Sequence, residues 1–178
     1  ANTAWMEVLN QDGALVPNSI KDLVSNQLVL VSASPLAASV DMNDGAAVRA
    51  AIGSGYLAMA MVDAVPAGIY GKQALMSLGI WDQLTDNIVQ ADNVRSALTY
   101  VALGEAGFGI VYASDVKADK NVFLVGSFPE ASHAPIRYPM AAIKGGQAAL
   151  ARGFFEFLES ADTRAIFDEF GFSPIPNP

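Results

Sequence analysis

The stretch Val65-Pro66-Ala67-Gly68-Ile69-Tyr70 decides the fold, because it predicts a helix that begins directly after an apolar strand. Proline suits the first helical position, where its fixed φ matches the helix. Ala67 and Gly68 then leave little side chain over the next backbone N–H groups. These amides have no partner inside the helix and lie at the positive end of its macrodipole, so the stretch predicts a site that favours an anion. An ordinary strand-to-helix turn is the alternative interpretation.

Strands alternate with helices on both sides of this stretch. Apolar runs predict strands near residues 28–31, 56–61, 109–112, 122–125 and 138–143. Between them, apolar residues at helical spacing predict helices that end at Gly53, Gly79 and Gly104. The alternation indicates an α/β fold with a mostly parallel sheet.

Helical patterns also occupy both ends of the chain. Residues 1–25 predict two helices, the second capped by Asn18. The residues after Gln147 predict two more, the last one capped by Asp162 and closed by Gly171. The chain starts inside a helical pattern and without an initiator methionine, so we expect that a preceding segment has been removed.

The composition limits the kind of protein. Of the 178 residues, 52% are apolar and 16% are charged, which is typical of a globular chain. The formal net charge of −8 and the scattering of Lys and Arg exclude nucleic acid as an expected partner. An acidic protein still binds an anion where the local field is favourable, because exposed charges farther away than about 8 Å are largely screened at physiological salt. No apolar run reaches the roughly 18 uncharged residues of a membrane-spanning helix.

The residue inventory also excludes several kinds of chemistry. Without cysteine, the chain has no disulfide, thiolate metal site or cysteine nucleophile. His133 is the only histidine, which excludes a histidine metal cluster, and we expect it to be a loop residue. A small α/β hydrolase or transferase that uses Asp115 and His133 is a weak alternative, since the chain has no Gly-x-Ser-x-Gly motif. Asp115 itself is expected to belong to a solvated acidic surface.

A second helix start and a tyrosine can join the first amide site. Asp92 or Asn93 is suited to cap a helix that begins at Val94, so Val94 carries another early helical amide. Tyr112 ends a predicted strand with a hydroxyl group. Because open α/β sheets bind ligands at the carboxyl ends of their strands, these donors can converge. A wall residue whose hydroxyl meets a buried carbonyl is the alternative interpretation of Tyr112.

Six sequence blocks occur in the order seen in one protein family. They are Val65–Tyr70, Leu78–Leu84, Asp92–Leu98, Gly109–Asp115, Phe128–His133 and Ile166–Phe172. In these blocks the chain resembles the molybdate-binding proteins of bacterial ABC transporters. The resemblance implies a type II periplasmic binding protein, in which two α/β lobes joined by two hinge strands close on molybdate or tungstate. It also implies delivery of the anion to a membrane permease, without enzymatic activity or a cofactor.

The resemblance assigns ligands to three residues of this chain. It implies that the oxyanion is held by the backbone N–H groups of Ala67 and Val94 and by the hydroxyl of Tyr112. No side chain would touch the metal directly. Neutral donors suit a tetrahedral oxyanion that carries no proton, and hydrogen phosphate would be rejected because its hydrogen finds no acceptor. A protein of the same fold for another oxyanion, such as sulfate, stays an alternative.

The resemblance also implies a division of the chain. The hinge strands would lie near Leu28–Ser32 and Tyr138–Ile143. Residues 1–33 would then hold the remnant of lobe I with the first hinge strand, residues 34–136 would form lobe II, and residues 137–178 would hold the second hinge strand and the helices that return to lobe I.

Two blocks of the family pattern have no counterpart in this sequence. The family begins with a strand–loop–helix that carries Ala-Ala-Ser-Leu and continues to a serine-rich loop, and each supplies a serine ligand. This chain starts where Trp5-Met6 matches a later motif of the family. We therefore expect an incomplete first lobe and weak anion binding, unless an N-terminal fragment or the partner chain of a swapped dimer completes the site.

Overall fold

The computed structural model describes residues 3–175, except for the side chains of residues 148–150, and divides the chain into two compact units. Unit 1 combines the residues up to Asn26 with those from Ile136 onward, and unit 2 runs from Gln27 to Pro135. The division into lobes that was expected after residues 33 and 136 stays a prediction. Among the described residues, none of the helices has the length and apolar character required to span a bilayer.

Unit 2 is built on a five-stranded sheet with the strand order β4-β3-β5-β2-β6. The strands are β2 (Leu28–Ser32), β3 (Leu57–Ala60), β4 (Ile88–Ala91), β5 (Phe108–Tyr112) and β6 (Phe123–Ser127). Strand β3 pairs in parallel with β4 and β5, whereas β2 pairs antiparallel with β5 and β6. Four strands therefore point in one direction and β2 points in the other, so the predicted mostly parallel sheet is a mixed sheet.

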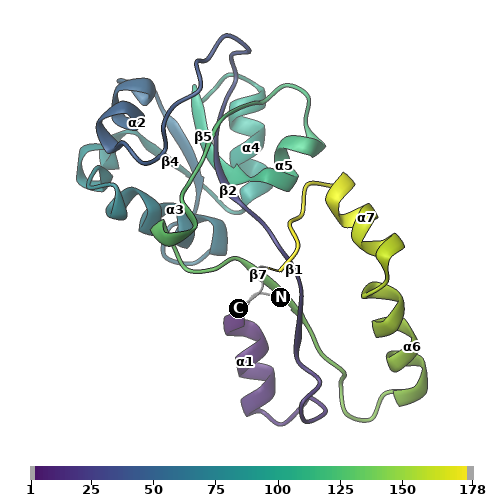
Figure 1. The fold of residues 1–178 in the computed structure, drawn as a ribbon. Coiled ribbons are helices and arrows are strands. Elements are labelled where there is room, and N and C mark those ends of the chain that lie inside the picture. Colours follow the sequence, from purple (N-terminus) through teal and green to yellow (C-terminus); the bar gives the residue numbers. More distant parts are fainter. Residues whose placement is uncertain (1–2, 176–178) are drawn as a thin grey trace. The chain divides into compact units, whose positions relative to one another are not determined.

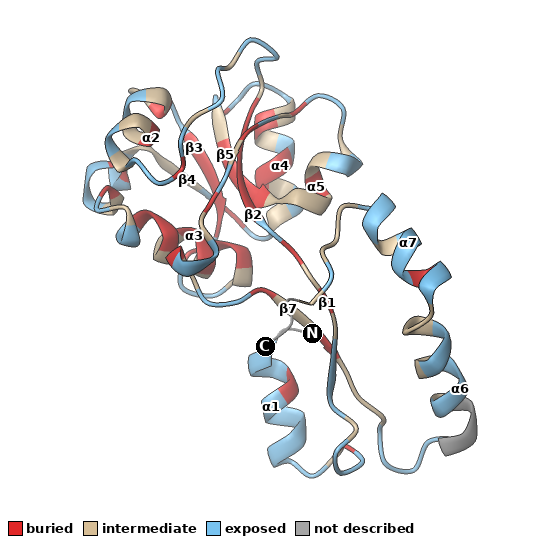
Figure 2. Ribbon diagram, in the orientation of Figure 1, coloured by how far each residue is buried: buried red, intermediate tan, exposed pale blue. Residues whose placement is uncertain are grey.

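The sheet of unit 2 carries the main core. All five residues of β2 and all four residues of β3 are buried, as expected for apolar runs in strands covered on both faces. Figure 2 shows these buried strands in red. Leu28–Ser32 was predicted to be a hinge strand; it lies inside this sheet, and the assignment of hinge strands stays a prediction.

Helices follow or precede each strand of unit 2. They are α2 (Gly45–Ile52), α3 (Pro66–Ser77), α4 (Val94–Ala102) and α5 (Ala113–Ala118), with short 3-10 turns at Trp81–Gln83, Thr85–Asn87 and Glu130–Ser132. Gly53, Gly79 and Gly104 follow α2, α3 and α4 with φ values of 62°, 70° and 75°. Left-handed backbone of this kind ends helices, so the three predicted helix ends are confirmed.

Unit 1 contains a two-stranded sheet and three helices. The elements are α1 (Thr3–Gln11), β1 (Lys21–Ser25), β7 (Arg137–Met140), α6 (Ala148–Leu158) and α7 (Ala161–Glu169). Strand β1 pairs antiparallel with β7 (Figure 1). An isolated bridge joins Ser25 to Ser173, which ties the segment after α7 to the end of β1.

Two predictions about helix starts in unit 1 are wrong. Residues 21–25 form strand β1 rather than a helix, because they pair with β7. Asn18 has φ 59°, in the left-handed region, whereas a helix N-cap has extended backbone. The cap of α7 is Ser160, whose Oγ accepts a hydrogen bond from the Thr163 amide at 3.2 Å, and Asp162 lies within the first turn.

The helices of unit 1 leave large apolar side chains exposed. Trp5 of α1 is 65% exposed, and Phe154 and Phe157 of α6 are 57% and 56% exposed. The rings of Phe154 and Phe157 lie 6.4 Å apart between centroids, so they form one patch. Exposed apolar patches on a protein surface are typical of contact surfaces.

We expect the chain to self-associate through this patch in a concentration-dependent manner. Substituting both Phe154→Ser and Phe157→Ser should lower the average molar mass in size-exclusion chromatography with light scattering, because the patch loses its apolar area. Leu36→Ser in unit 2, which removes an isolated exposed leucine, is the control and should leave the mass unchanged. A monomeric wild-type chain at all concentrations would contradict the prediction.

Candidate functional site

The three predicted anion ligands lie on elements that meet one edge of the sheet of unit 2. Strands β3 and β4 end at Ala60 and Ala91, which are paired in register, and α3 and α4 follow them. Strand β5 runs parallel to β3 and ends at Tyr112. Because parallel strands share a carboxyl edge, the starts of α3 and α4 and the end of β5 face the same edge.

Helix α3 begins as the sequence predicts. Val65 is the N-cap with extended backbone, Pro66 is the first helical residue, and no side chain caps the helix. The Ala67 amide donates to no acceptor within residues 3–175, although Ala67 is only 2% exposed. A buried N–H group without an acceptor costs about 1–3 kcal/mol, so this amide is suited to an external acceptor.

Gly68 allows this helix start to lie against the end of β3. A Cβ atom at this position would collide with the carbonyl oxygens of Ala60 and Met61. Glycine is therefore required at this position, because only a residue without a Cβ atom lets the two backbone segments approach so closely. Gly68 is thus explained by packing against the end of β3, in addition to the proposed approach of an anion.

The loop between β3 and α3 is fixed to strand β4. The Met61 amide donates to the Ala91 carbonyl at 2.9 Å, and the Val62 amide donates to Oε1 of Gln90 at 2.9 Å. These bonds hold the loop that leads into α3. The sequence does not single out Gln90, because a single glutamine in a strand carries no recognisable signal.

Helix α4 begins with a side-chain cap. Oδ1 of Asn93 accepts a hydrogen bond from the Ser96 amide at 2.9 Å, which decides between the two candidate caps in favour of Asn93. The Val94 amide, one residue further on, donates to no acceptor in the described part of the chain. The arrangement leaves a second helix N-terminus with a bare amide at the same sheet edge.

Tyr112 is the last residue of β5 and the N-cap of the short helix α5. It is half-buried, and its amide donates to Oδ2 of Asp115 at 2.9 Å. Asp115 is only 7% exposed, so its predicted place on a solvated acidic surface is wrong. Burial raises the pKa of Asp115, while the hydrogen bond from Tyr112 and the charge of Arg95 lower it in part.

A hydrolytic pair of Asp115 and His133 has no support in this geometry. Nδ1 of His133 contacts the Ala134 carbonyl at 2.8 Å, and the imidazole packs 5.9 Å from the ring of Tyr70. Within the described residues, no hydrogen bond joins His133 to Asp115. His133 is a loop residue whose ring nitrogen meets backbone, as the sequence predicts.

Comparison with known proteins identifies the family. The profile of the bacterial extracellular solute-binding proteins matches residues 1–173. The chain belongs to this family. It is 37% identical to the molybdate-binding protein of Haemophilus influenzae and 34% identical to that of Escherichia coli, in each case over 97% of this chain and 68% of the relative.

Two solved structures share the fold of this solute-binding protein. The substrate-binding domain of a putative molybdenum ABC transporter from Clostridium difficile has a TM-score of 0.80 at 34% identity, covering 97% of this chain and 73% of that one. The periplasmic molybdate-binding protein of Azotobacter vinelandii has a TM-score of 0.81 at 26% identity, covering 99% and 77%. The predicted α/β fold of the type II binding proteins is confirmed.

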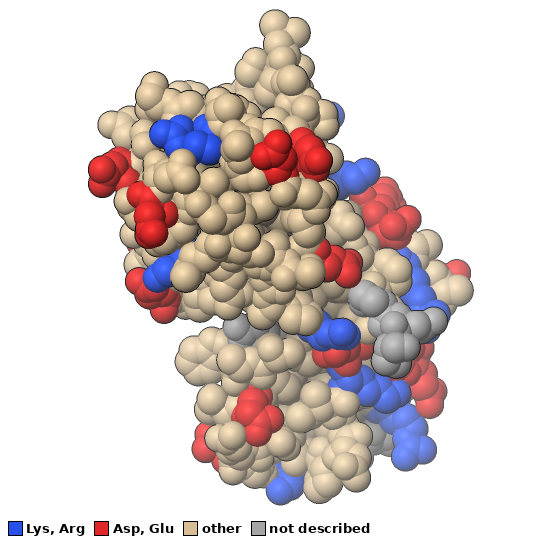
Figure 3. Space-filling model, turned by 60° about the vertical axis from the view of Figure 1, so that its left-hand side comes forward, with Lys and Arg blue, Asp and Glu red and all other residues tan. Residues whose placement is uncertain are grey.

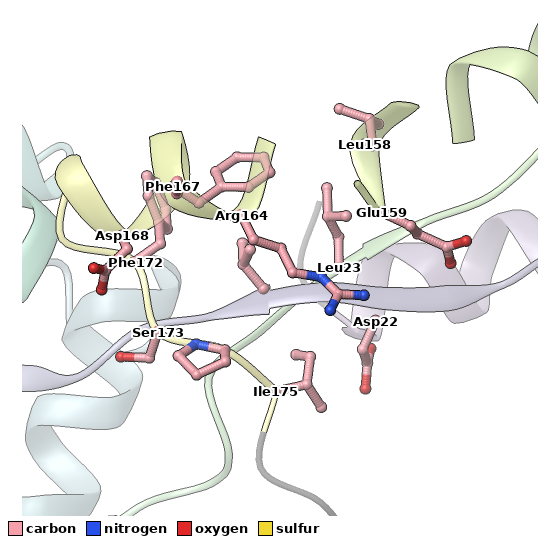
Figure 4. Close-up of a pocket in the computed structure, with 13 residues that line it drawn as sticks. Asp22, Leu23, Leu158, Glu159, Arg164, Phe167, Asp168, Phe172, Ser173 and Ile175 are labelled. Atoms are coloured by element: carbon pink, nitrogen blue, oxygen red, sulfur yellow. The ribbon is translucent and has the colours of Figure 1, made fainter. Parts of the chain in front are cut away.

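One cavity of this solute-binding protein lies in unit 1 and does not include the three predicted ligands. It has a volume of about 870 Å³ and lies between β1 and α7, with Leu23, Phe167 and Ile175 in its wall (Figure 4). Its charged lining consists of one guanidinium, from Arg164, and three carboxylates, from Asp22, Glu159 and Asp168. Glu159 is paired with Lys21 at 2.8 Å and Asp22 with Arg137 at 3.0 Å, which leaves one guanidinium and one carboxylate in the lining.

Charged side chains are dispersed over the visible surface. On the face that Figure 3 shows, most of the surface is uncharged, and Lys, Arg, Asp and Glu occur in small separate groups. Within the described residues, no group of three or more His, Cys, Asp or Glu side chains could hold a metal ion.

We expect Gly68→Ala to displace the start of α3, because the added Cβ meets two backbone carbonyls that cannot move freely. Overpacking of this kind costs about 1–3 kcal/mol, and the Ala67 amide should move with the helix. Urea unfolding measures the loss of stability, and the amide shift of Ala67 in NMR spectra measures the displacement. Gly107→Ala is the control, since a Cβ there meets open space; equal effects of the two substitutions would contradict the prediction.

Asn93→Ala should remove the cap of α4 and lower the free energy of unfolding by about 0.5–2 kcal/mol. It should also increase the mobility of the Val94 amide, which NMR relaxation measures. Asp44→Ala removes the comparable cap of α2, where Asp44 accepts from the Ala46 and Ala47 amides, and is the matched control. A similar loss of stability without any change at Val94 is expected for that control.

Proposed function

We propose that this solute-binding protein binds molybdate or tungstate as an oxyanion in the periplasm and delivers it to the permease of an ABC transporter. The relatives named above are molybdate-binding proteins, and two of them are 37% and 34% identical to this chain. Unit 2 contributes the backbone amides of Ala67 and Val94 and the hydroxyl of Tyr112 as donors. The protein acts by binding and release, without a catalytic step.

The observation that carries this proposal is the buried Ala67 amide, which donates to no acceptor within residues 3–175. It lies at the same sheet edge as Tyr112 and the Val94 amide. Each hydrogen bond from such a donor to a charged oxygen contributes about 1.5–3 kcal/mol. Each helix N-terminus adds about 0.3–1 kcal/mol. Neutral donors can therefore hold a dianion in a chain whose own net charge is −8.

The same donors favour a fully deprotonated oxyanion. Hydrogen phosphate would place an O–H group against N–H and O–H donors and leave its hydrogen unpaired, at a cost of about 1–3 kcal/mol. Sulfate lacks such a hydrogen and stays the competing ligand. The sulfate-binding protein of Mycobacterium tuberculosis shares the fold at 14% identity and a TM-score of 0.67, which carries no argument about the ligand.

We expect the 178-residue chain to bind molybdate weakly, with a Kd on the order of 0.1–1 mM, because three donors must also offset the entropy lost on association. An NMR titration should move the amide resonances of Ala67 and Val94, with tungstate competing and hydrogen phosphate inactive. Tyr112→Phe should weaken binding about tenfold, since one charge-assisted hydrogen bond is lost.

Tyr56→Phe removes the hydroxyl of an exposed tyrosine and is the matched control, for which no change is expected. Tighter binding of sulfate than of molybdate would favour the alternative ligand. A titration that leaves both amides unmoved would refute the assigned donors. Light scattering and intact mass spectrometry on the same sample test for a swapped dimer or a copurified N-terminal fragment, either of which should raise the affinity.

A further inference from the structure

Asp115 is a buried charged residue that the donor set does not use. Among the side chains that the structure describes, it is the one acidic or basic side chain that is buried, with 7% exposure. Removing a carboxylate from water is costly unless hydrogen bonds compensate. The buried carboxylate of Asp115 therefore requires a nearby hydrogen-bond donor.

That donor is the backbone of Tyr112. Oδ2 of Asp115 accepts the Tyr112 amide at 2.9 Å from the first turn of α5. Tyr112 has extended backbone, with φ −95° and ψ 155°, and the next residue is helical. The bond thus spans the point at which β5 ends and α5 begins, and it holds the backbone from which the tyrosine side chain leaves.

Arg95 links this junction to the second helix start. It follows Val94 in the first turn of α4, and its positive charge offsets part of the rise that burial causes in the pKa of Asp115. Asp115 therefore interacts with the backbone of one proposed donor, Tyr112, and with the charge of the residue that follows another, Val94.

We propose that Asp115 is a positioning residue for anion binding, which acts by holding the Tyr112 backbone so that the phenol stays at the sheet edge. The role requires a hydrogen-bond acceptor at this position and does not require its negative charge. The charge itself opposes a bound dianion. This inference rests on the proposed anion site, because it assigns Asp115 a role through one of the donors of that site.

Two substitutions separate the acceptor from the charge. Asp115→Ala removes both. It should weaken molybdate binding about tenfold, because the Tyr112 hydroxyl would no longer be held in place to donate to the anion. Asp115→Asn keeps an acceptor and should bind molybdate as tightly as the wild type or more tightly. Asp119→Ala and Asp119→Asn are the controls, since Asp119 accepts the Asn121 amide in the same way after α5, and both should leave the Kd unchanged.

A double-mutant cycle tests whether Asp115 acts through Tyr112. In the Tyr112→Phe background, Asp115→Ala should weaken molybdate binding by no more than about twofold, because the hydroxyl that it positions is already gone. An equal tenfold loss in both backgrounds would show a general structural role and overturn the inference. Asp115→Asn with the affinity of Asp115→Ala would also overturn it.

Amide hydrogen exchange gives a measurement that needs no ligand. The Tyr112 amide should exchange about tenfold faster in Asp115→Ala than in the wild type and should stay protected in Asp115→Asn. Should Asp115→Ala not fold, Asp115→Glu replaces it, since the longer side chain moves the acceptor and should also speed exchange. Unchanged protection of the Tyr112 amide in Asp115→Ala or in Asp115→Glu overturns the inference. A wild type that binds no molybdate refutes the proposed function instead.

Discussion

The register between β3 and its two parallel neighbours is the constraint on which the candidate site depends. Ala60 and Ala91 are paired at the ends of β3 and β4, so the chain enters α3 and α4 from the same edge. The parallel pairing of β3 with β5 brings Tyr112 to that edge as well. A shift of one residue in this pairing would turn every side chain of a strand to the opposite face, and the buried strands oppose such a shift.

The sequence predicts the parts of the site that rest on local chemistry. Pro66 at the first helical position, Gly53, Gly79 and Gly104 after helices, and the apolar run of β2 all carry their signal in single residues or short runs. These features depend on backbone preference and burial, which neighbouring residues in the sequence determine.

The sequence does not predict what depends on distant partners. Residues 21–25 became a strand only because β7, more than a hundred residues later, pairs with them. Gln90 likewise gained its role from a loop that precedes it by almost thirty residues. Tertiary contacts of this kind have no local signature. Asp115 is a different case, because its bond to the Tyr112 amide spans only three residues and it is the burial of its carboxyl that the sequence does not indicate.

Unit 2 is one uninterrupted segment, whereas unit 1 is made from both ends of the chain. During synthesis, Gln27 to Pro135 leaves the ribosome before β7 does, so the five-stranded sheet can begin to assemble while β1 still lacks its partner. The order of translation therefore favours the folding of unit 2 before that of unit 1. Nascent chains in which Pro135 has just left the ribosome would already hold the helix starts that carry Ala67 and Val94.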